Sequence, residues 1–156
     1  SKDGRLFIVG CGGSAANASH AVNDFRKICN IRTYFPLDNT SESSANTNDK
    51  GWENAFIEYF KNENINSNDT LLALSVGGGD KEKNISKNIA LSIDYFNSKK
   101  AKTCSIVGKE LGYAQLNSSI CLVIPIKDKS LTTPISESFQ VIIWHIIVSL
   151  KLLKKK

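Results

Sequence analysis

The chain has 156 residues, of which 41% are hydrophobic and 22% are charged, and its formal net charge is +5. This length is typical of one globular domain, so we expect 1–156 to fold as a single domain. The basic residues are scattered apart from the run at 154–156, which favours a solvated helix end over a nucleic-acid arm. The apolar stretch at 141–150 is too short to span a bilayer and carries His145.

The cysteines Cys11, Cys29, Cys104 and Cys121 have neither CxxC spacing nor the density of a disulfide framework. Reduced thiols are typical of the cytosol, and no signal peptide opens the chain. We therefore expect a soluble, cytoplasmic protein with no membrane or nucleic-acid partner.

Short β-branched runs alternate along the chain with segments of helical period. Strands are predicted at 5–10, 32–37, 70–76, 102–108 and 119–125, and helices at 15–29, 51–62, 84–98 and 135–153, with a polar loop at 37–50. This alternation predicts an α/β fold, with a five-stranded parallel sheet and helices on both faces. The last helix is apolar nearly all round and must be buried on more than one side, so we expect a homo-oligomer, a dimer or a tetramer.

Two glycine-rich segments follow predicted strands: GCGGS at 10–14 and SVGGGD at 75–80. Ligands of open parallel sheets bind beyond the carboxyl ends of the strands, and a helix start offers unpaired N–H groups to an anion. We expect Ser14 to cap the first helix and the two segments to hold an anion through Gly12, Gly13, Ser14, Ser75 and Gly77. Neither segment matches the dinucleotide fingerprint or a P-loop, and the alternative is two tight strand–helix turns.

The chain has two histidines, and each shares a predicted helix with a carboxylate. His20 and Asp24 are four residues apart and lie on one helix face. Glu137 and His145 are eight residues apart, a rise of roughly 12 Å, so one ion cannot comfortably bind both from one helix. Either Glu137 has an outer role or the site is shared between subunits. The alternative for each histidine is a structural role.

The segment GCGGSAANASHAVNDF resembles the GNGGSxxxAxHxxxEL signature of the phosphoheptose isomerases (sedoheptulose 7-phosphate isomerases). The resemblance continues through TNDKGW, SVGGGD, IVGKELGY and SESFQVIIWH, and so covers nearly the whole chain. It implies a flavodoxin-like sugar isomerase (SIS) domain without the helical segment that usually precedes it in that family.

The resemblance also implies roles for individual residues. By position, Asp24 is the base, His145 is the acid, and Asp49 and Glu137 are substrate contacts. The positions that bind a zinc ion in some members of the family fall on His20, Asp24, Glu137 and His145, with Glu137 in place of a glutamine. No nucleotide cofactor is implied.

The chain departs from the family pattern at several positions, which indicates a divergent subfamily. Cys11 replaces an asparagine, and Asp24 shortens the catalytic glutamate by one methylene. Hydroxyl donors of the second loop become Val76, Gly77 and Asp80, and a substrate-contact aspartate becomes Pro134. An acid at position 80 would repel phosphate unless it caps a turn, in which case Lys81 or Lys83 could replace the lost donors.

The leading hypothesis is an aldose–ketose isomerase that acts on a sugar phosphate through an enediol intermediate. The alternative is a non-catalytic SIS module that binds a sugar phosphate or scaffolds a protein partner. A third hypothesis is an aminosugar-phosphate isomerase or deaminase.

Overall fold

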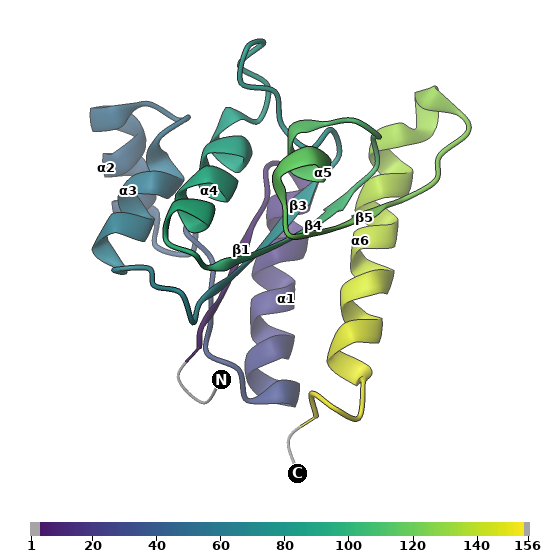
Figure 1. Ribbon diagram of the computed structural model, residues 1–156, viewed down its shortest axis with the longest axis horizontal. Helices are drawn as coiled ribbons and strands as arrows, with labels where there is room; N and C mark the ends of the chain where they lie inside the picture. The colour runs from purple at the N-terminus through teal and green to yellow at the C-terminus, as the bar shows by residue number, and fades with distance from the viewer. Residues whose placement is uncertain (1–3, 155–156) are drawn as a thin grey trace.

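The computed structural model describes residues 4–154, which fold around a five-stranded parallel sheet in the order β2-β1-β3-β4-β5 (Figure 1). The strands are β1 (Leu6–Val9), β2 (Thr33–Tyr34), β3 (Thr70–Ser75), β4 (Lys102–Val107) and β5 (Ile120–Val123). Every neighbouring pair is parallel. The predicted α/β fold with a five-stranded parallel sheet is confirmed.

Helices cover both faces of the sheet, as the alternating pattern predicted. They are α1 (Gly13–Cys29), α2 (Thr40–Lys50), α3 (Ala55–Asn62), α4 (Lys87–Ser98), α5 (Tyr113–Asn117) and α6 (Thr132–Ser149), the last preceded by the 3₁₀ turn η1 (Lys129–Leu131). Successive strand side chains point to opposite faces, so Phe7 packs with α3 and α4 whereas Ile8 packs with α1 and α6. These two layers form the core.

The predicted polar loop at 37–50 is wrong, because most of it forms α2. The side chain of Asn39 caps this helix by accepting hydrogen bonds from the backbone N–H groups of Ser41 and Glu42. Helix α2 is rich in Ser, Asn and Thr, which have low helix propensity, so its composition resembles that of a loop. It also buries no residue, so it lacks the apolar pattern that would indicate a helix. Contact with α3 stabilises it instead.

Other element boundaries differ at the carboxyl end of the sheet. The first helix is capped by the backbone of Gly12, so the prediction that Ser14 is its N-cap is wrong. Helix α4 begins three residues later than predicted because a turn intervenes, and the short helix α5 was not predicted. β2 has only two residues, ending before Pro36.

Helix α6 packs on the sheet through one face only. Trp144 and Val148 are buried, whereas the outward side chains of Phe139, Ile142, Ile146 and Leu150 are about half exposed. The helical segment Lys129–Ser149, with a mean hydropathy of 1.2, is long and apolar enough to cross a membrane by length and composition alone. Because its inner face belongs to the core of the domain, we interpret α6 as a helix that covers the sheet and has an unpartnered apolar side.

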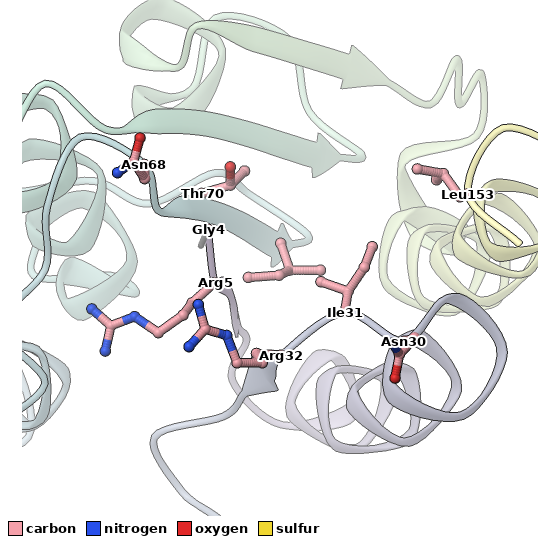
Figure 2. Close-up of a pocket in the computed structure, with 9 residues that line it drawn as sticks. Gly4, Arg5, Asn30, Ile31, Arg32, Asn68, Thr70 and Leu153 are labelled. Atoms are coloured by element: carbon pink, nitrogen blue, oxygen red, sulfur yellow. The ribbon is translucent and has the colours of Figure 1, made fainter. Parts of the chain in front are cut away.

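The amino-terminal end of the sheet holds a network of paired charges around Arg5. Arg5 also lines an open cavity of about 560 Å³ (Figure 2). The Arg5 guanidinium donates to both carboxylate oxygens of Asp69, at 3.0 and 2.7 Å, and to Glu63 at 3.1 Å. Asp69 is fully buried and also accepts from the backbone N–H of Asn66. This network ties β1 to the turn that precedes β3.

Candidate active site

The two glycine-rich loops lie at the carboxyl end of the sheet, where the strand order reverses. β1 lies between β2 and β3, so the chain leaves β1 toward one edge of the sheet and later returns to build the other half. The loops that follow β1 and β3 therefore border the crevice in which open α/β sheets bind ligands. The sequence predicted this position correctly because both loops directly follow buried strands.

The first loop brings the start of α1 close to the backbone of β1. A Cβ on Gly10 would lie 2.3 Å from the carbonyl oxygen of Ser14, and Gly12 has a φ of 60°, so both positions require glycine. The hydroxyl of Ser14 is buried and has no hydrogen-bond partner within the described chain. The thiol of Cys11 donates to Oδ1 of Asn88 in α4, and burial raises the pKa of this thiol. The first loop is thereby linked to the helix that follows the second loop.

The acidic residue of the second loop is engaged within its own turn, and it lines a cavity of about 500 Å³ together with Gly77. The carboxylate of Asp80 accepts hydrogen bonds from the backbone N–H groups of Lys83 and Glu82, which hold the pKa of Asp80 below its usual value. A backbone bridge between Asp80 and Ile85 closes this turn, which protrudes beyond the sheet (Figure 1). Lys81 pairs with Asp94 and lies over the ring of Tyr113, so its ammonium group is already engaged by partners within the protein.

The hydroxyl of Ser75 lies inside the second loop, where it accepts a hydrogen bond from the backbone N–H of Gly78 at 3.0 Å. Gly78 and Gly79 both have positive φ angles, which L side chains rarely adopt. A Cβ built on Gly77 would meet open space. No neighbouring side chain therefore covers the backbone at this position in the crevice. The loop can therefore present backbone and hydroxyl groups to a ligand.

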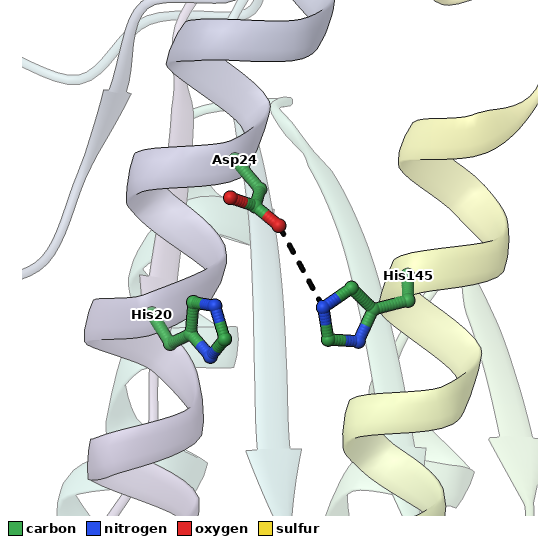
Figure 3. A group of neighbouring side chains, drawn as sticks. All are labelled: His20, Asp24 and His145. Carbon is green, nitrogen blue, oxygen red and sulfur yellow. Dashed lines mark ion pairs between the residues drawn. The ribbon is translucent and has the colours of Figure 1, made fainter.

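Three of the four predicted polar residues meet between α1 and α6 (Figure 3). One ligand atom each of His20, Asp24 and His145 lie within 4.8 Å of one another. Nε2 of His145 lies 3.7 Å from Oδ2 of Asp24, and the two imidazole rings are 5.4 Å apart. Residues more than 120 positions apart in the sequence thus share one site, which periodicity alone could not establish.

The hydrogen bonds of His145 determine what its second nitrogen can do. Nδ1 lies 2.8 Å from the backbone carbonyl of Val141, which can only accept, so Nδ1 carries a proton. In the neutral ring, the lone pair of Nε2 therefore faces the carboxylate of Asp24. Two electron-rich groups facing each other favour a cation between them, either a proton or a metal ion. A histidine oriented by a backbone carbonyl is the usual arrangement for a metal ligand.

The remaining predicted site residues lie elsewhere. The carboxylate of Glu137 lies against Gly13, since a Cβ built there would come within 2.3 Å of Oε2. It lies outside the His20–Asp24–His145 group, so its metal-binding role stays a prediction that this arrangement does not favour. Asp49 is exposed on α2, where it accepts a hydrogen bond from Asn48. Its substrate contact likewise stays a prediction.

Two residues that the sequence analysis missed support the site. The indole of Trp144 is fully buried, stacks on His145 at 3.6 Å and contacts the edge of His20. Asn17 donates to the backbone carbonyl of Glu137 and to Gln140, which fastens α1 to α6. The three-residue spacing between Asn17 and His20 could have indicated that they share a helix face.

The chain is similar in sequence to proteins named as phosphoheptose isomerases. It is 27% identical to the phosphoheptose isomerase of Helicobacter pylori (strain Shi470) over 149 residues, which cover 92% of this chain and 72% of that protein. The predicted resemblance to the phosphoheptose isomerases is confirmed. It is also 29% identical over 148 residues to the lincomycin biosynthesis protein LmbN of Streptomyces lincolnensis, 91% of this chain and only 54% of that protein. No protein-family model matches the chain.

Solved structures show the same fold. The phosphoheptose isomerase GmhA of Neisseria gonorrhoeae superposes with a TM-score of 0.76 at 18% identity, covering 94% of this chain and 76% of that chain. The sugar isomerase domain of an RpiR transcription factor from Sphaerobacter thermophilus superposes with a TM-score of 0.60 at 15% identity, covering 94% and 70%. The fold is therefore that of an SIS domain, which occurs both in isomerases and in regulators.

Proposed function

We propose that this SIS domain is a sugar-phosphate isomerase that interconverts an aldose and a ketose through an enediol. The similarity to phosphoheptose isomerases supports a role of this kind. The observation that carries the proposal is the meeting of His20, Asp24 and His145 between α1 and α6. A pure binding module has no need to bring a carboxylate and two imidazoles together.

In this proposal the Asp24 carboxylate removes a proton from the carbon beside the substrate carbonyl. His145 exchanges a proton with the carbonyl oxygen through Nε2, since Nδ1 is held by Val141. The Ser14 and Ser75 hydroxyls and the loop amides hold the phosphate end. His20 lies seven residues beyond Gly13 on α1, a rise of roughly 10 Å, so a long open-chain sugar phosphate fits better than a short one.

A zinc ion fits the same donors. His20, Asp24 and His145 offer two imidazole nitrogens and one carboxylate oxygen, a ligand set that leaves one position of a tetrahedral ion free for substrate. A bound ion would polarise the substrate carbonyl. Zinc and a proton compete for the lone pair of Nε2, so His145 can act as the acid only when this lone pair is free of metal.

A second copy of the chain fits the open side of the site. His20 is exposed, and an apolar cavity of about 570 Å³ lies beside His145 along the outward face of α6. Excluding water from the site would strengthen each electrostatic interaction in it. Packing of this face against another copy in a dimer or tetramer would exclude water from the site. It would also bury the outward side chains of α6. The cytoplasmic location of the protein remains a prediction.

The test is to incubate the purified protein with sedoheptulose 7-phosphate and other ketose phosphates in deuterated water, alongside metal analysis of the same sample. We expect deuterium at the carbon next to the carbonyl. Asp24→Asn should abolish exchange, whereas the matched change Asp38→Asn, at an exposed acid whose side chain accepts a hydrogen bond from Ser19, should not. Exchange that survives Asp24→Asn would contradict the assigned base.

The second candidate function is a non-catalytic module that binds a sugar phosphate. The second loop favours it, because Val76 and Gly77 offer no side-chain donor and Asp80 uses its carboxylate within its own turn. The transcription factor with the same fold adds support. Saturable binding of sedoheptulose 7-phosphate without any deuterium exchange would select this function over the isomerase.

A further inference from the structure

Three aromatic rings meet between α1 and α6, and two of them are the imidazoles of the candidate active site. The indole of Trp144 and the imidazole of His145 stack nearly parallel, with centroids 3.6 Å apart and an interplanar angle of 29°. The imidazole of His20 lies nearly perpendicular to both, at 73° to the indole and 81° to the other imidazole. Trp144 is therefore a ring that both histidines contact.

Hydrogen bonds alone do not fix the orientation of the two imidazoles. His145 is held at Nδ1 by the backbone carbonyl of Val141, but one hydrogen bond does not define the plane of a ring. His20 is exposed and makes no hydrogen bond to another residue within 4–154, where its contacts are with the rings of Trp144 and His145. The ring contacts must therefore supply the rest of the orientation.

Trp144 can orient two neighbouring rings because its own position is fixed. Its side chain is fully buried in the core layer that also contains Ala21 and Val22 of α1. Side chains at the packing density of a protein core are held in one low-energy rotamer. His145, by contrast, is partly exposed and so has less packing of its own.

Tryptophan is not the residue that stability alone would select at position 144. The indole Nε1–H is buried and has no hydrogen-bond partner within residues 4–154. A buried donor without a partner destabilises a fold, and leucine or phenylalanine would fill the same apolar layer without leaving one. The contact of the indole with both imidazoles supplies a reason for a large flat ring at this position.

We propose that Trp144 is a positioning residue, which sets the orientation of both imidazoles relative to the Asp24 carboxylate. The stack fixes the plane of His145, so that Nε2 faces Oδ2 of Asp24 at 3.7 Å, and the perpendicular contact keeps His20 beside them. The indole is buried and does not itself touch substrate. The consequence for turnover rests on the proposed function, because misplacing a catalytic group by about 1 Å can lower a rate by about 100-fold.

The first test is NMR of the full chain with isotope-labelled histidine at one fixed pH. The chain has two histidines and two tryptophans, so the spectrum is simple, and His20→Gln assigns its signals. The faces of an indole shield nearby protons, so the ring protons of His145 should resonate upfield of those of a free histidine, and cross-peaks should connect the two imidazoles. Trp144→Leu removes the ring but keeps an apolar side chain, and it should abolish the upfield shift and weaken the cross-peaks.

The control for this spectrum is Trp52→Phe. It replaces a partly exposed tryptophan that packs on Phe56 rather than on a histidine, so both the shift and the cross-peaks should remain. Signals of His145 at the free-histidine position in the wild type would overturn the proposal. This outcome does not depend on Trp144→Leu being folded.

The second test separates positioning from packing by comparing two substitutions at position 144. Both Trp144→Phe and Trp144→Leu leave a cavity and should lower the melting temperature, but only phenylalanine keeps a ring that can face His145. In the deuterium-exchange assay with sedoheptulose 7-phosphate, Trp144→Leu should lower kcat by about 100-fold with little change in KM, because the indole does not contact substrate. Trp144→Phe should retain most of the wild-type kcat.

The control for lost packing is Phe56→Leu, which removes a fully buried ring outside the site. It should lower the melting temperature but keep the wild-type kcat at temperatures where it is folded. If Trp144 has only a structural role, the kcat values of its two variants should instead follow their melting temperatures, and the proposal is then wrong.

The two tests also separate this inference from the proposed function. If the wild type catalyses exchange but Trp144→Leu keeps both the wild-type kcat and the shifts of His145, the inference fails alone. If the wild type catalyses no exchange, the proposed function fails, and the NMR comparison still decides whether Trp144 orients the two imidazoles.

Discussion

The two ends of the sheet treat buried polar groups in opposite ways. At the amino-terminal end, Arg5 and Asp69 use nearly all their hydrogen-bonding capacity on each other and on neighbouring backbone. At the carboxyl-terminal end, the hydroxyl of Ser14 and the amide nitrogen of Asn88 are buried without a partner in the described chain. Buried polar groups are usually paired, so the first arrangement is typical of a structural role and the second of a ligand site.

This difference teaches that a cavity by itself does not mark a functional site. The cavity beside Arg5 is flanked by an arginine whose charge is already neutralised by Asp69 and Glu63. The crevice at the glycine loops has buried polar groups without a partner in the described chain, and a cluster of titratable groups lies between α1 and α6. Substitutions at the amino end should therefore change stability, and substitutions at the carboxyl end should change binding and catalysis.

The largest expected effect is at the His20–Asp24–His145 group. His145→Gln removes the proton-exchanging ring while keeping a polar side chain, so turnover should fall by about 100- to 10,000-fold. The thermal unfolding temperature should stay close to that of the wild type, because the His145 ring is partly exposed. A steady-state isomerase assay with a parallel melting curve checks both. Undiminished turnover would remove His145 from the mechanism.

Asp69→Ala should have the largest effect on stability. It leaves the Arg5 guanidinium partly buried without its main partner, which typically costs about 3–5 kcal/mol in the free energy of unfolding. The control is Glu58→Ala, which breaks the exposed pair with Lys61 and should cost under about 0.5 kcal/mol. Urea denaturation measures both. Similar losses for the two variants would show that the amino-end network has no special structural role.

Acid should weaken the same network. Burial alone would raise the pKa of Asp69, but hydrogen bonds from the Arg5 side chain and the Asn66 backbone outweigh it and lower the pKa. The stabilisation is therefore complete above the unfolded-state pKa, about 3.9, and is lost as the pH falls below that value toward the folded-state pKa. The difference in the free energy of unfolding between the wild type and Asp69→Asn should therefore become smaller below about pH 4. A constant gap from pH 7 to pH 3 would contradict this sign.

The smallest expected effect is at Ser14. Among the residues that the structure describes its hydroxyl has no partner to lose, so Ser14→Ala should change the free energy of unfolding by less than about 0.5 kcal/mol. Binding of sedoheptulose 7-phosphate should weaken by about 10- to 150-fold, because one hydrogen bond to an anion contributes about 1.5–3 kcal/mol. Ser92→Ala is the control, since this buried hydroxyl donates to the Asn88 carbonyl and should affect stability but not binding. If Ser14→Ala lowers the free energy of unfolding but leaves binding unchanged, Ser14 has a structural role.

The sequence predicted the parts of the fold that strong local patterns encode. The buried apolar runs at β1, β3 and β4 located the central strands, and the glycines that follow β1 and β3 located the two glycine-rich loops. Helix α2 was missed because its Ser, Asn and Thr residues have the composition of a loop and it buries none of them. The start of α4 was misplaced because the pattern does not reveal the bridge that closes the turn between Asp80 and Ile85.

By itself the sequence determined the α/β sheet, the two glycine loops and the chemical types of the polar residues, because these depend on periodicity and on side chains that are close together along the chain. Only the tertiary structure decided which of those residues meet. It brought His20, Asp24 and His145 to one point and placed Glu137 against Gly13, because the packing of α6 on α1 sets the rotation of each helix, and short-range patterns carry no information about that rotation.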